Sequence, residues 1–284
     1  MANILIAGAT GYLGGYIAQE LKRQRHHTRV LVRSVLRFEA SGIEADEIVY
    51  AEITDKTTLQ GCCNGVDAVI SSVGITRQRD GLTYMDVDYR ANLNLLEEAV
   101  RAGVKKFVYV SVLNGERLRH LKICEAKERF VDALKGSGVD YCVIRPNGFF
   151  SDMTEFYTMA TRGRVYLFGD GRYRSNPIHG ADLAKVCVEA LGRGDGEMDV
   201  GGPETLTQKE IAQVAFDAAG KPTRITYVPD WGRRFVLATA RLCLSKARFG
   251  PLEFFMHVMA MDMVAPEYGE HTVANFFQGL KKTG

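Results

Sequence analysis

The sequence predicts an α/β protein with a doubly wound parallel sheet and a smaller α/β lobe interwoven with it in the C-terminal half. Three observations predict this class. Short apolar runs alternate with segments of helical periodicity, and a glycine-rich turn joins the first run to the first helical segment. After Pro146 the alternation becomes irregular, although no low-complexity linker or internal repeat divides the chain.

Six short apolar runs in the first half of the chain are the predicted strands. They lie at 4–7, 28–32, 47–50, 67–71, 106–111 and 141–145. Apolar residues at helical spacing predict helices over 89–100 and 125–134. Strands that alternate with helices pair in parallel, since each crossover helix returns the chain to the same end of the sheet.

The second half of the chain contains fewer regular elements. Glycine-rich turns are expected at 162–164 and 168–171, a helix at 181–191, and a short strand with a turn at 198–203. Thr207 and Glu210 form a capping box that opens another helix. The predicted domains are a sheet domain over 1–150, to which 176–200 return, and a smaller lobe over 151–175 and 201–284.

Composition limits the function classes. With 46% hydrophobic and 25% charged residues and a net charge of +2, the chain of 284 residues is typical of a soluble globular protein and not of a nucleic-acid binder. The six cysteines show no paired metal-ligand spacing, so we expect no metal site and reduced thiols. The chain opens on its first strand, and no apolar run is long enough to span a membrane. We therefore expect a cytoplasmic protein.

Residues 235–264 carry many large apolar side chains between basic ones. This sequence pattern predicts a pair of helices that builds a core or binds a protein partner or second copy, rather than a helix that lies in a membrane interface. Trp231, the only tryptophan, is expected to line a substrate mouth or to anchor a loop.

The glycine-rich turn predicts a dinucleotide-binding loop. Gly8, Gly11 and Gly14 follow the first predicted strand at the spacing Gly-x-x-Gly-x-x-Gly and lead into a helix. Glycine lets the backbone approach a diphosphate closely, and the helix N-terminus attracts its charge. We expect the contacts from this loop to come from Gly8, Thr10, Gly11, Tyr12, Leu13 and Gly14.

The end of the second strand predicts which dinucleotide binds. An acidic residue there would bond the adenine ribose and repel a 2′-phosphate, but no Asp or Glu occurs from 28 to 38. Arg33, Ser34 and Arg37 stand there instead. Because guanidinium groups bind phosphate through charge-assisted hydrogen bonds, NADP(H) is preferred over NAD(H).

Ligands of such sheets bind beyond the carboxyl ends of the strands, so residues that follow strands are further candidates. Ile53 is expected over the adenine, and the small residues after the fourth strand are expected beside the ribose or nicotinamide. The turn after the sixth strand is rigid and is expected at the nicotinamide end. These candidates are Ile53, Ser72, Val73, Gly74, Pro146, Asn147 and Phe149.

The chain resembles the atypical or extended short-chain dehydrogenase/reductase superfamily, and within it the NmrA-like and isoflavone-reductase-like NAD(P)-binding proteins. The residues that carry the resemblance span most of the chain, at 8–14, 31–34, 109–111, 126–127, 144–150, 176–184 and 201–204. The resemblance implies a Rossmann fold and a nicotinamide dinucleotide as cofactor.

The resemblance also implies catalytic residues, with one departure. Typical members carry a serine after the fifth strand and Tyr-x-x-x-Lys on the next helix. Ser111 and Lys127 match the serine and the lysine, but Ile123 stands at the tyrosine position and cannot carry a proton. Lys127 would hold the nicotinamide ribose and stabilise or protonate an oxyanion on a small-molecule substrate, and Ser111 would orient it.

Two functions remain open from the sequence. One is an NADP(H)-dependent reductase of a small carbonyl, enone or quinone. The other is a non-catalytic NADP(H)-binding sensor, or an assembly factor for a redox complex. A sugar-nucleotide epimerase is less favoured, since epimerases of this superfamily depend on the missing tyrosine.

Overall fold

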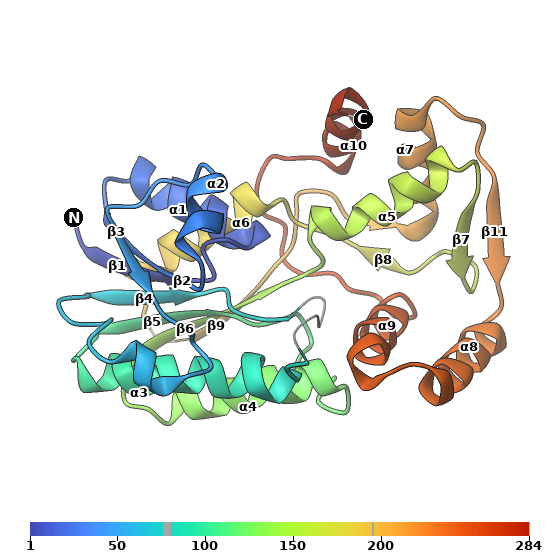
Figure 1. Ribbon diagram of the computed structural model, residues 1–284. Coiled ribbons are helices and arrows are strands. Elements are labelled where there is room, and N and C mark those ends of the chain that lie inside the picture. Colours follow the sequence, from blue (N-terminus) through green and yellow to red (C-terminus); the bar gives the residue numbers. More distant parts are fainter. Residues whose placement is uncertain (76–80, 195, 284) are drawn as a thin grey trace. The chain divides into compact units, whose positions relative to one another are not determined.

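The computed structural model describes residues 1–75, 81–194 and 196–283 (Figure 1). The chain divides into two compact units. The first comprises Met1–Arg145 and Leu183–Met198, and the second Pro146–Asp182 and Asp199–Gly284. The predicted sheet domain, 1–150 with 176–200, overlaps the first unit, but 146–150, 176–182 and 199–200 belong to the second.

The first unit holds the main sheet. Its strands are β1 (Asn3–Ala7), β2 (His27–Val32), β3 (Glu47–Tyr50), β4 (Ala68–Ser71), β5 (Lys106–Val110), β6 (Asp140–Pro146) and β9 (Gly196–Val200). Its helices are α1 (Tyr12–Arg23), α2 (Val35–Ala40), α3 (Asn92–Arg101), α4 (Lys122–Lys135) and α6 (Gly180–Glu189), with short turns η1 (Lys56–Leu59), η2 (Met85–Ala91) and η3 (Ala190–Gly192).

The sheet has the order β3-β2-β1-β4-β5-β6-β9, and the pairs from β3 through β6 are parallel. In register, Ile6 of β1 lies between Val30 of β2 and Ile70 of β4. Helices α3 and α4 cover one face of the sheet, and α1 and α6 cover the other (Figure 1). The order reverses at β1, so the chain winds in both directions from it, and the predicted Rossmann fold is confirmed.

The central strands are buried on both faces, as parallel strands between helix layers must be. Every residue of β4 and β5 is buried. Tyr109 of β5 is fully buried, and its ring packs 4.5 Å from that of Phe130 on α4. Tyr109 is thus a core residue.

The helix predicted over 89–100 is not a single α-helix in the structure. Its first part belongs to a π-helix, η2, and α3 begins only at Asn92. The Asn92 side chain donates to the carbonyl oxygens of Val87 (3.2 Å) and Asp88 (3.1 Å) and accepts a 2.6 Å hydrogen bond from Ser71 Oγ. These side-chain bonds satisfy groups that the wider turn leaves unpaired.

The second unit has its own small core. Its helices are α5 (Phe150–Thr161), α7 (Gln208–Ala219), α8 (Asp230–Cys243), α9 (Lys246–Val258) and α10 (Val273–Thr283). Its strands form two pairs, β7 (Val165–Phe168) with β11 (Ile225–Val228) and β8 (Arg174–Ser175) with β10 (Leu206–Thr207). Phe156, Phe216 and Phe277 join α5, α7 and α10 in one apolar cluster. The predicted capping box of Thr207 and Glu210 opens α7.

Helix α8 does not build a core, so that part of the expectation for 235–264 is wrong: none of its residues is buried.

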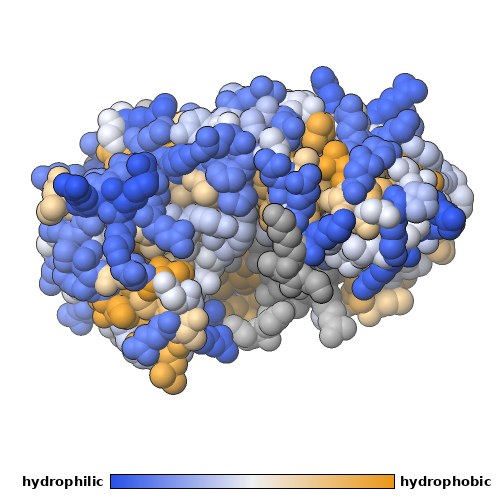
Figure 2. Space-filling view, turned by 90° about the horizontal axis from the view of Figure 1, so that it is seen from above, coloured by the Kyte–Doolittle hydropathy of each residue, from blue (hydrophilic) through white to orange (hydrophobic). Residues whose placement is uncertain are grey.

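Within the described ranges, no helix combines the length and the apolar character that crossing a membrane requires. The face of the molecule drawn in Figure 2 is mostly hydrophilic, with hydrophobic side chains gathered in small patches.

Candidate functional site

The glycine-rich loop joins β1 to α1 in a form that only glycine permits. Gly8 has φ +92°, in the left-handed region, and its carbonyl accepts a 2.9 Å bond from Gly11 N. A Cβ on Gly14 would lie 2.0 Å from the Gly8 oxygen, so α1 packs directly on the loop. The N-cap of α1 is Gly11, with no side-chain cap and no acidic residue in the first turn. The positive end of α1 therefore remains available to an anion.

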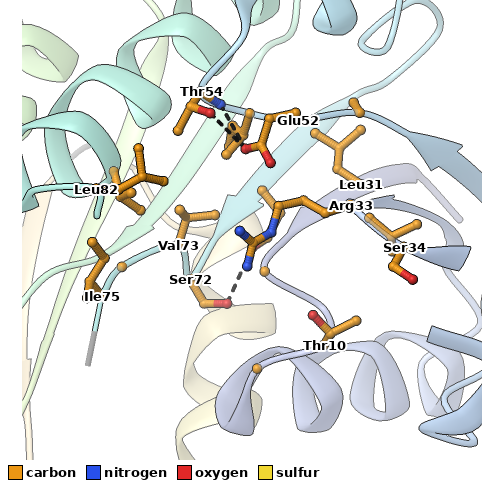
Figure 3. Close-up of a pocket in the computed structure, with 18 of the residues that line it drawn as sticks. Thr10, Leu31, Arg33, Ser34, Glu52, Thr54, Ser72, Val73, Ile75 and Leu82 are labelled. Carbon is orange, nitrogen blue, oxygen red and sulfur yellow. Dashed lines mark hydrogen bonds between the residues drawn. The ribbon is translucent and has the colours of Figure 1, made fainter. Parts of the chain in front are cut away.

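A cavity of about 390 Å³ lies at the carboxyl ends of β1 to β4, wholly within the first unit (Figure 3). Its two ends differ in polarity. Apolar side chains lie at one end (Val73, Ile75 and Leu82), and polar side chains lie at the other (Arg33 and Ser34). Of the predicted cofactor residues, those lining the cavity are Gly8, Thr10, Gly11, Arg33, Ser34, Arg37, Ile53, Ser72, Val73 and Gly74.

The polar end of the cavity holds the two arginines that follow β2. Ser34 is the N-cap of α2, and its hydroxyl accepts from the Arg37 N–H at 3.4 Å. The guanidinium of Arg33 points across the glycine-rich loop toward Ser72 (Figure 3). Two exposed guanidinium groups thus border the cavity, next to a helix N-terminus.

Sequence reasoning missed two polar residues of the cavity, Glu52 and Thr54. The Glu52 carboxylate accepts from the Thr54 hydroxyl (2.9 Å) and backbone N–H (3.3 Å), which fixes the turn that carries Ile53 (Figure 3). Both residues could have been predicted from the sequence, because they follow the third strand at the same edge of the sheet.

Lys127 projects from α4 to a buried carboxylate below the cavity wall. Its Nζ lies 3.1 Å from Asp88 Oδ1, 3.5 Å from the Val110 oxygen and 5.4 Å from the centre of the Tyr109 ring. Asp88 is fully buried. A Cβ on Gly74, which lines the cavity, would lie 2.7 Å from Asp88 Oδ1 and 3.0 Å from Lys127 Nζ. The ion pair therefore lies directly behind Gly74.

The pair fixes the charge of Lys127. Burial by itself lowers the pKa of an ammonium, but Tyr109 and Asp88 outweigh it and raise the pKa of Lys127 above its ordinary value. Burial raises the pKa of Tyr109 as well, so its phenol stays neutral. At neutral pH this cluster presents an ammonium that keeps its proton. Asp88 was not predicted, and as one acid within a helical pattern it gave no sequence signal.

Ser111 is held by a different network. Its hydroxyl is buried and donates to Glu128 Oε1 at 2.9 Å. Arg145 binds both oxygens of the same carboxylate, at 2.6 and 2.7 Å, and its Nε donates to Glu197 at 2.7 Å. Ser111 does not line the cavity.

The tyrosine position offers no acid. Ile123 is half-buried on α4. The neighbouring Cys124 is fully buried, and burial raises the pKa of its thiol to about 12. Neither side chain can supply a proton at neutral pH.

The remaining predicted residues lie outside the cavity. Tyr12, Leu13 and Gly14 form the first turn of α1. Pro146, Asn147 and Phe149 belong to the second unit, where Asn147 donates to Asn176 Oδ1 at 2.9 Å and Phe149 is the N-cap of α5.

A parallel, doubly wound sheet with a glycine-rich loop at a helix N-terminus and a cavity at its carboxyl edge defines a dinucleotide-binding protein. More particularly, the chain belongs to the NAD(P)H-binding family, whose model matches residues 8–193. The predicted membership of the atypical short-chain dehydrogenase/reductase superfamily, with its isoflavone-reductase-like proteins, is confirmed.

Three similar proteins illustrate its neighbours. A solved NADPH-dependent quinone oxidoreductase of Escherichia coli, in complex with NADPH, shares the fold over 98% of this chain and 99% of its own, with a TM-score of 0.74 and 19% identity. The photosystem II assembly factor Ycf39 of Guillardia theta is 27% identical over 80% of this chain and 73% of its own length. The chloroplastic divinyl chlorophyllide a 8-vinyl-reductase of Oryza sativa subsp. indica is 27% identical over 99% and 79%.

Proposed function

We propose that this protein is an NADP(H)-dependent reductase of a small electron-poor substrate, an enone or quinone in preference to a simple carbonyl. The observation that carries the proposal is the arrangement along one sheet edge: a glycine-rich loop, two arginines after β2, and the Lys127 ammonium behind Gly74.

The residues present fit NADP(H). The loop from Gly8 to Gly14 and the start of α1 would hold the diphosphate. Arg33 and Arg37 would bind the 2′-phosphate, and Ile53 would cover the adenine. Gly74 lines the cavity with the Lys127–Asp88 pair directly behind it, so a nicotinamide ribose against Gly74 would lie near Lys127. When bound, NADP(H) supplies a hydride from its nicotinamide ring.

Lys127 would act as a fixed positive charge. Since its pKa is raised, it would stabilise negative charge that develops on the substrate oxygen without giving up its proton. The proton that completes the reduction would come from water. Ser111 could orient a substrate only by giving up its bond to Glu128, so the proposal depends on Lys127.

The missing proton donor favours enones and quinones. A simple ketone leaves a strongly basic alkoxide, which needs an acid such as the absent tyrosine. An enone or quinone leaves a delocalised anion that is far less basic, so a positive charge and water suffice. The quinone oxidoreductase and the vinyl reductase among the similar proteins support this substrate class.

A specific observation favours the second candidate, a non-catalytic NADP(H)-binding sensor or assembly factor. Lys127 is paired with Asp88, and Ser111 is engaged by Glu128, so both residues have structural partners that need no substrate. The similarity to Ycf39, an assembly factor, supports the same candidate.

One experiment separates the two candidates. Purified protein, NADPH or NADH, and a panel of quinones, enones and simple ketones are mixed, and the absorbance of the reduced nicotinamide is followed. The reductase proposal expects faster consumption of NADPH than NADH with quinones or enones, and a loss of at least tenfold in Lys127→Ala, consistent with one lost charge stabilisation. Tight NADPH binding without consumption on any substrate would favour the sensor instead.

A further inference from the structure

Helix α8 is attached to the second unit on one side only. None of its residues is buried. Arg233 faces inward, where it pairs with Asp230 at 2.7 Å and donates to the Met256 oxygen on α9 at 3.4 Å. Within the second unit, no element that the structure describes covers the opposite side of the helix.

That outer side carries a continuous apolar stripe. Trp231, Phe235, Ala238 and Leu242 follow one another at spacings of four, three and four residues, which places them on one face of the helix. The side chains of Trp231, Phe235 and Leu242 are 72%, 64% and 87% exposed. Large apolar side chains in one exposed row mark a contact surface.

Basic residues accompany the stripe. Arg234 and Arg241, seven residues apart, lie along one flank and are both exposed, and Arg234 also pairs with Asp230 at 2.7 Å. Arg241 makes no ion pair with any residue that the structure describes. The sequence from 230 to 248 contains five basic residues and only one acidic residue, Asp230, although the whole chain has a net charge of +2. The surface is therefore complementary to negative charge.

We propose that α8 lies in the interfacial layer of a lipid bilayer with anionic headgroups, its stripe inserted and its arginines on the phosphates. An exposed apolar row flanked by arginines, with an aromatic side chain at its first turn, is typical of helices that lie along a membrane surface. The inference is independent of the proposed function, because it concerns the second unit and not the cavity.

The charges argue against a second copy as the occupant. Two-fold pairing through the stripe would bring the row of Arg234 and Arg241 against its own copy, and like charges repel. The helix is also only about 20 Å long, and one stripe of that length covers less than the roughly 800 Å² that each partner buries in a stable complex.

Trp231 makes the test direct, because it is the only tryptophan in the chain. Its emission is recorded while the full chain is titrated with vesicles of phosphatidylcholine alone, or of two parts phosphatidylcholine to one part phosphatidylglycerol. We expect a blue shift and co-sedimentation with the anionic vesicles only, and stronger quenching when the lipids carry bromine on the acyl chains. Added salt should weaken the binding.

Variants separate the contribution of the apolar stripe to vesicle binding from that of the arginines. Phe235→Glu with Leu242→Glu should lower the partition coefficient by at least about tenfold, since each apolar side chain loses its transfer energy. Arg234→Glu with Arg241→Glu should lower it about fivefold or more per residue on anionic vesicles. The matched controls are Val100→Glu with Tyr166→Glu and Arg117→Glu with Arg162→Glu, which alter exposed residues elsewhere and should leave binding unchanged.

Several results would overturn the proposal: no shift of Trp231 emission, equal binding to neutral vesicles, or binding that the control variants weaken as much as the α8 variants. A dimer in analytical ultracentrifugation that Phe235→Glu with Leu242→Glu abolishes, without vesicle binding, would make a second copy the occupant.

Discussion

At the scale of single residues, Arg33 and Arg37 should decide which dinucleotide binds. Replacing both by alanine should raise the Kd for NADPH about 10- to 100-fold, because a hydrogen bond to a charged group contributes about 1.5–3 kcal/mol. The Kd for NADH should change little. Isothermal titration calorimetry measures both. Arg162→Ala, an exposed arginine of the second unit, is the control. An equal loss for the two dinucleotides would contradict the assignment to the 2′-phosphate.

Asp88 should help to set the charge state of Lys127. Asp88→Asn removes one of the two groups that raise the pKa of Lys127, so that pKa falls. In the parent protein that pKa lies above its ordinary 10.5, so the charge is complete at any lower pH and is lost only as pH rises through the higher value. The variant should lose NADPH binding at a lower pH than the parent, which a titration across alkaline pH measures.

Asp88→Asn should also lower the free energy of unfolding by about 3 kcal/mol, because it breaks a buried ion pair. The control is Asp86→Asn on the same π-helix, where the half-buried carboxylate pairs with the exposed Arg90. Identical pH profiles of NADPH binding for Asp88→Asn and the parent would show that Asp88 does not set the charge state of Lys127.

At the scale of elements, the junction of β1 with α1 tolerates no side chain at Gly14. Gly14→Ala would force a Cβ against the Gly8 carbonyl, and backbone cannot give way as a flexible side chain can. We expect a loss of roughly 1–3 kcal/mol in stability and more than tenfold in NADPH affinity. Thermal melts and titrations measure these. Gly136→Ala, at a right-handed C-cap with no atom closer than 3.6 Å, should change neither. NADPH affinity unchanged in Gly14→Ala would contradict the role of the loop.

The π-helix η2 is the element that periodicity described least well. Apolar spacing indicates a helix, but it cannot distinguish a π-turn from an α-turn. In the structure this segment carries Asp88, whose Oδ2 also accepts the Ile75 N–H at 3.2 Å in the cavity wall. Single π-turns recur at functional sites, and this one places a carboxylate beside Lys127, directly behind Gly74 of the cavity wall.

At the scale of the whole molecule, Asp182 should contribute to stability above acid pH. Burial alone would raise its pKa, but the N–H groups of His271 and Glu270 and the His271 ring lower it below 3.8. A lowered pKa adds stability that is present above 3.8 and is lost as pH falls through the lower value. Asp182→Asn should therefore cost about 1–3 kcal/mol at neutral pH, and the difference should shrink below about pH 3.8 in urea titrations.

The control is Asp140→Asn at the exposed start of β6, which should leave stability unchanged at both pH values. A difference between Asp182→Asn and the parent that stays constant down to the acid limb would mean that the Asp182 charge adds nothing beyond its hydrogen-bonding shape.

The sequence alone determined what depends on neighbours along the chain. The positions of strands β1 to β6, the loop from Gly8 to Gly14 and the capping box of Thr207 were predictable, because periodicity and local backbone chemistry encode them. The short strands β7, β8, β10 and β11 of the second unit were not predicted. That Arg33 and Arg37 line the cavity was also predictable, since parallel strands bring the residues after them to one edge of the sheet.

Only the tertiary structure decided what depends on distant segments. Asp88 and Lys127 lie on different helices, and Glu128, Arg145 and Ser111 come from three different elements that only the tertiary fold brings together. The apolar residues of α8 gave the same sequence signal as a core helix, and only packing showed that none is buried. The physical reason is that burial and electrostatic partners are set by contacts between segments, which periodicity along one segment does not contain.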